Sequence, residues 1–394
     1  MNKIWRMLAA VLTALPLGGC WSKIELNDRS FITSAYIDMG DNPGEIMLTI
    51  GAPLPNRLGS ASNVQSPSQL GLAYTSNTQS AATLPEALEA IQKDLTRKLT
   101  WGQTRAIVVS EQFAVKRGME ELLEWASRNP SIPLRTFVFI SEGQAKEIMN
   151  LTPVFERAPS EVLREFGNRH FVGHATLRDL AVASADGVGL AVPLLHMGKR
   201  PLVSEQGQDR WWVGPDGAAM IQDMHMKGTL DIEETKSVSW ASGSLTEPIY
   251  QLLSGNGRYN IKLNELHGEV GPRFRNGMLE CRVKLTAEAT LESTQTTQDV
   301  TEPRLLHGLE RKINLEIATD MQRALDKSKQ AGTDVLQVGR RLEWRYPRYW
   351  DSVKNRWPEI YREDMRFIVE ANVRITHLNA ENKPLWSTRK GGAS

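Results

Sequence analysis

The most reactive feature of the sequence is Cys20, which follows Leu17-Gly18-Gly19 at the end of a short apolar run. Leucine three positions before a cysteine and glycine directly before it form the pattern of a bacterial lipobox. A cysteine thiolate is the nucleophile that accepts a diacylglyceryl group as a thioether. The two glycines leave room around the sulfur atom. We therefore predict cleavage after residue 19 and lipid attachment at Cys20.

Residues 1–19 have the composition of a lipoprotein signal peptide. Lys3 and Arg6 supply the positive flank, and residues 7–17 supply the apolar region. As a helix this run is about 16 Å long, which is too short for a bilayer core of about 30 Å. Two or more acyl chains on one cysteine would hold the mature protein stably at a membrane. The alternative is a plain secretory signal with an incidental cysteine.

The second cysteine is interpreted as a core residue. Cys281 lies in an alternating stretch and shares a face with Leu279, Val283 and Leu285. If Cys20 carries lipid, Cys281 has no partner for a disulfide within the chain. A thiol on an apolar strand face behaves as a small hydrophobe, so we do not expect a catalytic cysteine.

Signatures of catalysis and of cofactor or metal binding are weak. The sequence has no phosphate loop and no Gly-x-Ser-x-Gly elbow, and the turn at residues 255–257 lacks the context of a dinucleotide site. His170 and His174 have helical spacing for a metal, but the intervening residues lack a glutamate. Glu233 and Glu234 lie on an expected strand and would point to opposite faces. We expect a non-enzymatic protein without catalytic residues, metal or cofactor.

Aromatic and basic residues alternate near the C-terminus. Residues 340–362 contain seven basic and three acidic side chains, a net charge of +4. Three tryptophans are candidates for a partner surface: Trp344, Trp350 and Trp357. The competing interpretation docks these rings on the core while the arginines face water. Stacking on nucleic acid bases is a third possibility, but export and an overall net charge of +1 make nucleic acid a poor partner.

Hydrophobic periodicity predicts an α+β fold whose sheets are mostly antiparallel in the second half. Residues 31–38 and 45–50 form an expected hairpin, and residues 60–80 form an expected long exposed loop. Helices and strands then alternate, beginning with a helix capped by Thr83 and Glu86. The polar stretch 199–216 is an expected boundary. The elements expected after it are strands at 218–221, 228–232, 259–263, 278–291 and 365–377 and a helix at 306–325.

These landmarks together resemble the Ger(x)C family, the lipoprotein C subunits of spore germinant receptors. The opening Gly19-Cys20-Trp21 is similar to the family's Gly-Cys-Trp-Asp, with Ser22 in place of the aspartate. Further matching positions follow in the family's order along nearly the whole chain: Glu25, Leu26, Asp28, Tyr36, Ile37, Asp38, Arg105, Gly118, Arg128, Arg135, Gly228, Leu230, Thr235, Trp240, Asp334, Gly339, Pro347, Trp350 and Trp357.

The resemblance implies an elongated lipoprotein of several small α/β domains on the outer face of the spore inner membrane. The expected division is a signal peptide at 1–19, an N-terminal germination domain at 20–200, a mostly β middle domain at 201–290 and a C-terminal α/β domain at 291–394. The implied partners are the membrane-embedded A and B receptor subunits. Whether this subunit binds a small molecule stays open. The alternatives are an exported solute-binding lipoprotein of a transporter and an exported hydrolase.

Overall fold

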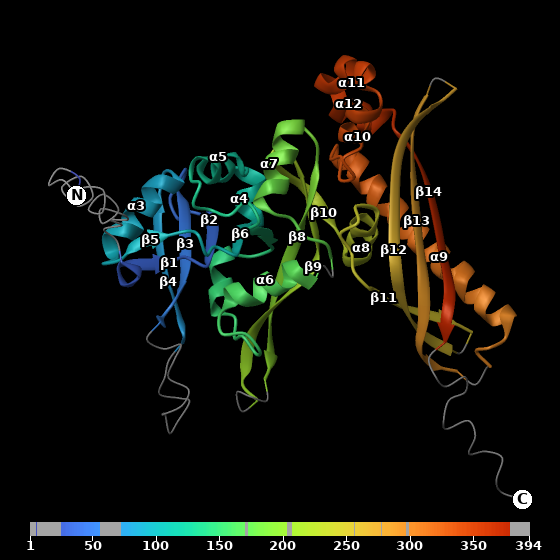
Figure 1. Ribbon diagram of the computed structural model, residues 1–394, viewed down its shortest axis with the longest axis horizontal. Coiled ribbons are helices and arrows are strands. Elements are labelled where there is room, and N and C mark those ends of the chain that lie inside the picture. The colour runs from blue at the N-terminus through green and yellow to red at the C-terminus, as the bar shows by residue number, and fades with distance from the viewer. Residues whose placement is uncertain are drawn as a thin grey trace, which may run out of the picture.

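The computed structural model describes Trp5 and residues 25–55, 72–169, 172–202, 207–255, 257–276, 278–296 and 299–378. Within these residues the chain forms an elongated body with a large mixed sheet at one end and a smaller sheet at the other (Figure 1). Cys20 and the expected signal peptide, apart from Trp5, lie outside the described residues. The expected α+β class is confirmed, as two domains with mixed sheets.

The first sheet has eight strands in the order β10-β9-β8-β7-β6-β2-β3-β4. The centre is parallel, because β2, β6, β7 and β8 run in one direction, and both edges are antiparallel. The strands are β2 (Ser34–Met39), β3 (Ile46–Pro53), β4 (Tyr74–Ala81), β6 (Ala106–Ser110), β7 (Phe137–Ser141), β8 (Leu190–Pro201), β9 (Asp209–Gln222) and β10 (His225–Leu230).

Helices cover both faces of this sheet because its central strands are apolar on both sides. Ile107 and Val109 pack under one set of helices, α3 (Leu84–Asp94), α4 (Glu111–Lys116), α5 (Glu120–Arg128) and α7 (Leu177–Asp186). Val108 and Phe139 pack on the opposite face under η5 (Ala145–Asn150) and α6 (Pro159–Arg169). The small parallel pair β1 (Arg29–Phe31) and β5 (Lys98–Thr100) and the short η2 (Leu26–Asp28) lie near the N-terminus.

The second sheet has the order β11-β12-β13-β14 and is antiparallel except at its last pair. Its strands are β11 (Ile249–Ser254), β12 (Gly257–Arg275), β13 (Met278–Gln295) and β14 (Arg366–Leu378). The long helix α9 (Pro303–Ala331) packs on it through a helical stripe that includes Leu309, Ile313, Ile317 and Met321. The chain then makes three short helices and the 3-10 turn η7 (Lys354–Arg356): α10 (Val338–Arg345), α11 (Pro347–Val353) and α12 (Trp357–Glu363).

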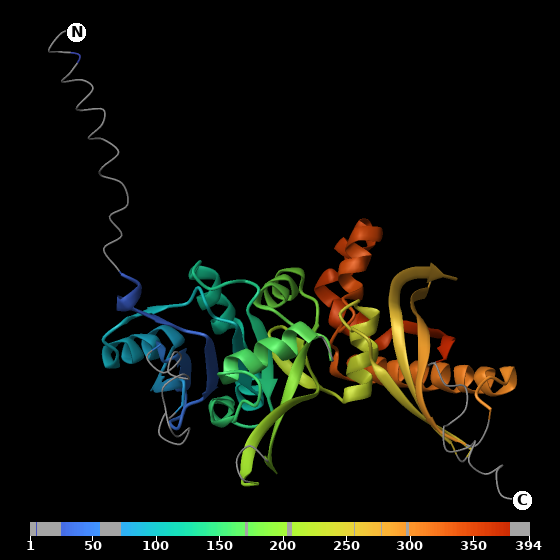
Figure 2. The ribbon, with the colours of Figure 1, turned by 60° about the horizontal axis from the view of Figure 1, so that its bottom comes forward.

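Helix α8 (Ile232–Ala241) connects the two sheets (Figures 1 and 2). One hydrophobic core holds Trp240 of α8 and the second sheet together with Met220 and Leu230 of the first sheet. The division expected from the sequence does not follow the sheets. The boundary at 200/201 falls inside β8, and the boundary at 290/291 falls inside β13, which pairs with β14.

Two local expectations need correction. Residues 74–80, expected in a loop, belong to β4, because backbone pairing with β3 and a 2.7 Å hydroxyl contact between Thr49 and Thr78 stabilise a polar edge strand. Glu233 and Glu234, expected on a strand, lie in the first turn of α8, where the Asp231 side chain accepts from both backbone amides. Between these regions, Gly118, with φ of +79°, separates α4 from α5.

Candidate functional site

The C-terminal motif folds into what we call the aromatic module, which consists of α10, α11, η7 and α12. Gly332, with φ of +63°, ends α9 in the left-handed conformation that glycine favours. Prolines at the first turn of α11 and of α12 set the starts of both helices. The module therefore stands as a compact group of helices at one end of the second sheet (Figure 1).

Asp334 organises the aromatic module from a position that is only 1% exposed. Its carboxylate accepts hydrogen bonds from the backbone amides of Val338 and Gly339, at 2.8 and 2.7 Å, and from Trp357 Nε1 at 3.1 Å. Burial raises the pKa of Asp334 above its ordinary value, although these three donors and the charge of Arg341 act in the opposite direction. The carboxylate fixes the start of α10 to the ring at the start of α12.

Two of the three tryptophan candidates are core residues. Trp350 and Trp357 are 5% and 1% exposed and meet edge to face, with ring centroids 5.4 Å apart. Gly339 makes this packing possible, because a Cβ atom there would lie 2.7 Å from Trp350 and 2.9 Å from Trp357. The expectation that Trp350 and Trp357 offer a partner surface is corrected here, because both rings are turned inward onto the core.

Trp344 is the exposed member of the three, with 70% of its surface accessible. The Arg340 guanidinium lies over its ring at 4.8 Å from the centroid, which is a cation–π contact. The same guanidinium forms an ion pair with Asp186 of α7, with Nε 3.3 Å from Oδ2. Arg340 therefore connects an exposed aromatic ring of the second domain to the first domain.

Three contacts form a joint between the domains, which we call the domain joint. The first is the Arg340–Asp186 pair. The second is a close backbone approach, since a Cβ atom on Gly189 would lie 2.7 Å from the Asp334 amide nitrogen. The third lies beside them on α8, where buried Glu234 caps the Asp231 amide and pairs with Lys327 of α9 at 2.6 Å. An ion pair, a close backbone approach and a buried carboxylate thus hold the two domains together.

The remaining cysteine is inert by position. Cys281 is fully buried in the core beneath α9, as the alternating pattern predicts, and burial raises the pKa of its thiol to about 12. In a Cys20→Ala background we expect iodoacetamide at pH 8 to leave Cys281 unmodified in the folded protein and to alkylate it in guanidinium chloride. Mass spectrometry reads out both states, and rapid modification of the folded protein would contradict the buried position.

The histidine pair does not form a described metal site, since His170 lies outside the described residues. His174 packs edge to face on Phe137, and burial lowers the pKa of its imidazole. A different group offers metal ligands on β8, on β9 and directly after β7. The ligand atoms of Glu142, His196 and Asp216 lie within 4.8 Å of one another, and His196 Nδ1 is 2.6 Å from Glu142 Oε2. A divalent cation fits the chemistry of these donors.

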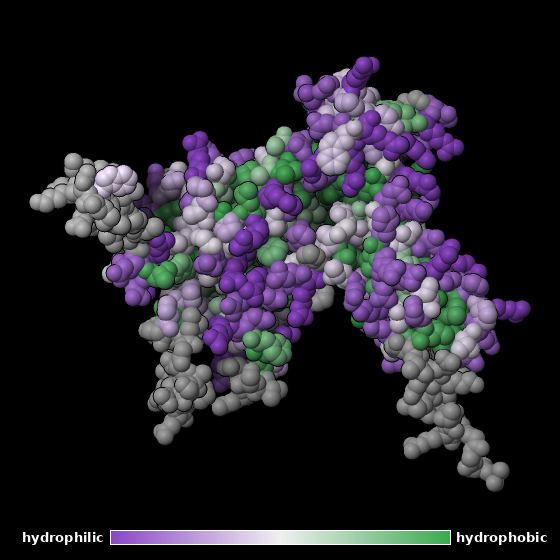
Figure 3. Space-filling view, in the orientation of Figure 1, coloured by the Kyte–Doolittle hydropathy of each residue, from purple (hydrophilic) through white to green (hydrophobic). Residues whose placement is uncertain are grey.

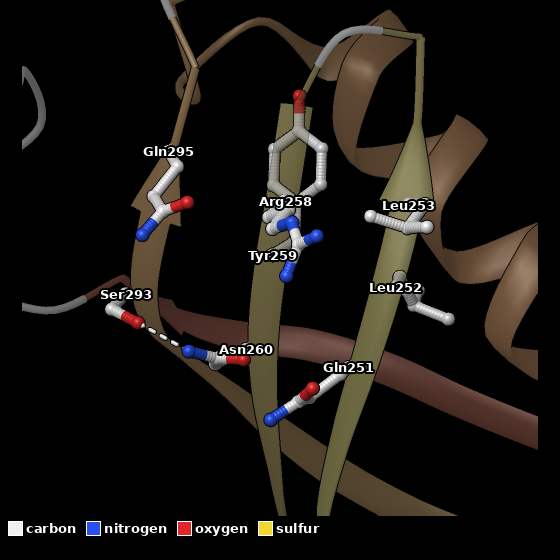
Figure 4. Close-up of a pocket in the computed structure, with 8 residues that line it drawn as sticks. All are labelled: Gln251, Leu252, Leu253, Arg258, Tyr259, Asn260, Ser293 and Gln295. Carbon is white, nitrogen blue, oxygen red and sulfur yellow. Dashed lines mark hydrogen bonds between the residues drawn. The ribbon is translucent and has the colours of Figure 1, made fainter.

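A shallow polar groove crosses β11, β12 and β13 (Figure 4). Its volume is about 350 Å³, and its wall includes Gln251, Asn260, Ser293 and Gln295. Asn260 Nδ2 donates to Ser293 Oγ at 2.7 Å. Arg258 is the charged side chain among the eight that line it. These neutral amides and the hydroxyl do not form an acid–base pair.

Sequence reasoning missed the domain joint. Asp231 and Glu234 follow the spacing of a capping box, so the start of α8 could have been predicted locally. The pairing of Arg340 with Asp186 joins residues far apart in the sequence, and its two residue types give no local signal. In the view of Figure 3 the aromatic module presents mostly hydrophilic side chains beside a few apolar ones.

The fold and the site together define the structural class of this protein. This is a two-domain α+β protein with a packed domain joint and a buried carboxylate at the centre of its C-terminal helices. Among the described residues, none of the helices combines the length and apolar character needed to cross a bilayer. The aromatic module holds α10 and α12 together through Asp334, and Trp344 is its exposed tryptophan.

Comparison with known proteins agrees with this class. Residues 22–197 match the family described as "Spore germination protein N-terminal domain", and residues 216–379 match "Spore germination B3/ GerAC like, C-terminal". The chain belongs to the GerAC-like family of spore germination proteins, the C subunit family. The resemblance inferred from the sequence is therefore confirmed.

The relatives are distant and match over nearly their full length. Spore germination protein KC of Bacillus subtilis is 20% identical over 95% of this chain and 96% of the relative. Putative spore germination protein YfkR of the same organism is 21% identical over 91% and 93%. The crystal structure of the GerBC protein superposes with a TM-score of 0.56 at 15% identity, covering 87% of this chain and 97% of that one. That likeness establishes the shared fold.

Proposed function

We propose that this protein is the lipid-anchored C subunit of a spore germinant receptor and that it has no catalytic activity. In this proposal Cys20 carries the lipid and the mature chain lies on the outer face of the spore inner membrane. It acts there beside the membrane-embedded A and B subunits in the response to nutrient germinants. The observation that carries the proposal is the ordered match of two germination domains directly after a lipobox-like cysteine.

The structure suggests what such a subunit does mechanically. A shared core and the ion pair between Arg340 and Asp186 connect the domains, so a displacement at one end reaches the other. Trp344 and the neighbouring arginines form the surface that we assign to a protein partner or to an anionic lipid. The two sheets differ in strand number and order, unlike the paired lobes with which a transporter's solute-binding lipoprotein closes on its ligand. This difference favours the receptor subunit.

The test is a Cys20→Ala variant expressed at the native level in spores. We expect the protein to leave the membrane fraction and germination to slow strongly, because the acyl chains supply the anchoring energy, at about 0.8 kcal/mol per buried methylene. Cys281→Ser is the matched control, which removes the other thiol and should leave membrane fractionation unchanged. A Cys20→Ala protein that stays in the membrane fraction of spores with a normal response would refute the anchor.

A further inference from the structure

A second cavity lies between α8, β11 and α9, away from the aromatic module. Its volume is about 500 Å³. Three carboxylates and one amine line it, and they belong to Glu233, Lys236, Glu316 and Asp320. The cavity therefore combines an excess of acidic side chains with walls from three different elements, which hold those side chains in place.

Tyr250 of β11 forms part of the cavity wall, and the environment of its hydroxyl is unusual. The residue is 5% exposed, and its hydroxyl is buried without a hydrogen-bond partner among the described residues. An unsatisfied buried hydroxyl is costly, so such a group calls for an explanation. Burial is the main cause of the raised pKa of Tyr250, and the charges of Glu233, Asp320 and Glu316 add to it. Tyr250 thus lines the cavity together with these three carboxylates.

The three carboxylates differ in whether a cationic side chain is paired with them. Glu233 is paired with Lys236 at 2.9 Å, and Asp320 is paired with Arg323. Glu316 makes no hydrogen bond or ion pair with any described residue. The nearest cation on its own helix, Lys312, donates its ammonium group to the carbonyl of Leu253. One half-buried carboxylate and one buried hydroxyl in the cavity wall therefore have no hydrogen-bond partner among the described residues.

The spacing of these groups distinguishes between kinds of cation. A metal ion needs its oxygen ligands within about 2.0–2.6 Å of one point. Among the described residues, the set whose ligand atoms all lie within 4.8 Å of one another does not include Glu233, Glu316 and Asp320. The three carboxylates therefore do not converge on one point as the ligands of a bound metal ion do. An ammonium group needs a less compact set of oxygens, because its N–H donors reach acceptors about 2.7–3.2 Å from the nitrogen.

We propose that this cavity binds a small organic ammonium ion. Its N–H groups would donate to the Glu316 carboxylate and to the Tyr250 hydroxyl oxygen, while Asp320 adds negative charge to the wall. Ligand binding would satisfy the buried hydroxyl that the free protein leaves unpaired. This inference does not depend on the membrane anchor, so a failure of either proposal leaves the other standing.

The test uses the purified full-length protein in detergent and n-propylammonium as the probe, followed by saturation-transfer NMR. n-Propanol matches the probe in size without its charge, and Ca²⁺ tests for a metal site. We expect saturable binding of the ammonium ion, with neither n-propanol nor Ca²⁺ competing for it. No ammonium binding, equal binding of n-propanol, or displacement by Ca²⁺ would each overturn the proposal.

Two variants locate the binding. Glu316→Gln should weaken the binding of n-propylammonium about tenfold or more, because a neutral amide oxygen replaces the charged acceptor of the hydrogen bond. Tyr250→Phe should weaken it about fivefold while leaving the thermal midpoint unchanged or higher, since it removes only an unpaired hydroxyl. Glu363→Gln and Tyr349→Phe, matched changes outside the cavity, should bind as the unmodified protein does. Unchanged affinity in both cavity variants would overturn the assignment.

Discussion

Replacement of Asp334 with alanine is expected to lower the free energy of unfolding by about 3–5 kcal/mol, which makes it one of the most damaging single changes in this chain. The variant removes the acceptor of two backbone amides and of Trp357 Nε1, all three of which are buried contacts. Each buried donor that loses its partner costs about 1–3 kcal/mol. The loss should separate α10 from α12 and loosen the aromatic module.

Guanidinium titration followed by tryptophan fluorescence measures this effect, because Trp350 and Trp357 report on the module directly. Asp351→Ala is the control, since Asp351 is an exposed aspartate of α11 whose partner is Lys354. Exposed ion pairs contribute about 0–1 kcal/mol, so this variant should unfold close to the unmodified protein. Equal midpoints for the two alanine variants would show that the Asp334 carboxylate does not organise the module.

The same carboxylate predicts a pH dependence whose sign can be derived. Burial raises the pKa of Asp334, so the folded state holds this proton more tightly than the unfolded chain does. The resulting stability is fully present below the ordinary pKa of 3.8 and is lost as the pH rises through the raised value. Asp334→Asn removes this titration. The stability advantage of the unmodified protein over Asp334→Asn should therefore shrink as the pH rises.

Elements with regular hydrophobic spacing could be predicted from the sequence alone. The stripe of α9 and the alternation in β13 and β14 determine which face is buried, whatever they pack against. Residues 74–81 lack such a signal. They are mostly Ser, Thr, Asn and Gln, and they form β4 because β3 offers an unpaired edge nearby. A strand that forms because a neighbouring strand pairs with it cannot be predicted from its own residues alone.

The candidate site also has a part that could be predicted from the sequence and a part that could not. The motif containing Asp334, Gly339, Trp350 and Trp357 is visible in the sequence, but the direction of each ring is not. Trp350 and Trp357 are buried because Asp334 and the space above Gly339 receive them, whereas Trp344 points outward beneath Arg340. Composition alone treats the three tryptophans alike. Tertiary contacts across the module decide which ring a partner could reach.

Gly217→Ala is the second change from which we expect a large effect, about 4 kcal/mol or more of lost stability. Gly217 lies in β9 at φ of +129°, a conformation that residues with a side chain rarely adopt. An added Cβ atom would also lie 2.2 Å from the carbonyl oxygen of Leu230, the last residue of β10. Backbone cannot yield as a side-chain tip does, so Leu230 and the α8 cap that follows must move.

Gly243→Ala is the control for an alanine without a close contact, because Gly243 also has positive φ, at +73°, but a Cβ atom there meets nothing within 4 Å. This control should lose about 1–2 kcal/mol from the backbone conformation alone. The excess loss in Gly217→Ala then measures the close contact between β9 and the end of β10 together with the less favourable φ of +129°. Because α8 begins there and leads into the second domain, we also expect Gly217→Ala to increase protease cleavage between the domains. Equal destabilisation by both variants would show that the contact with Leu230 relaxes freely and does not position α8.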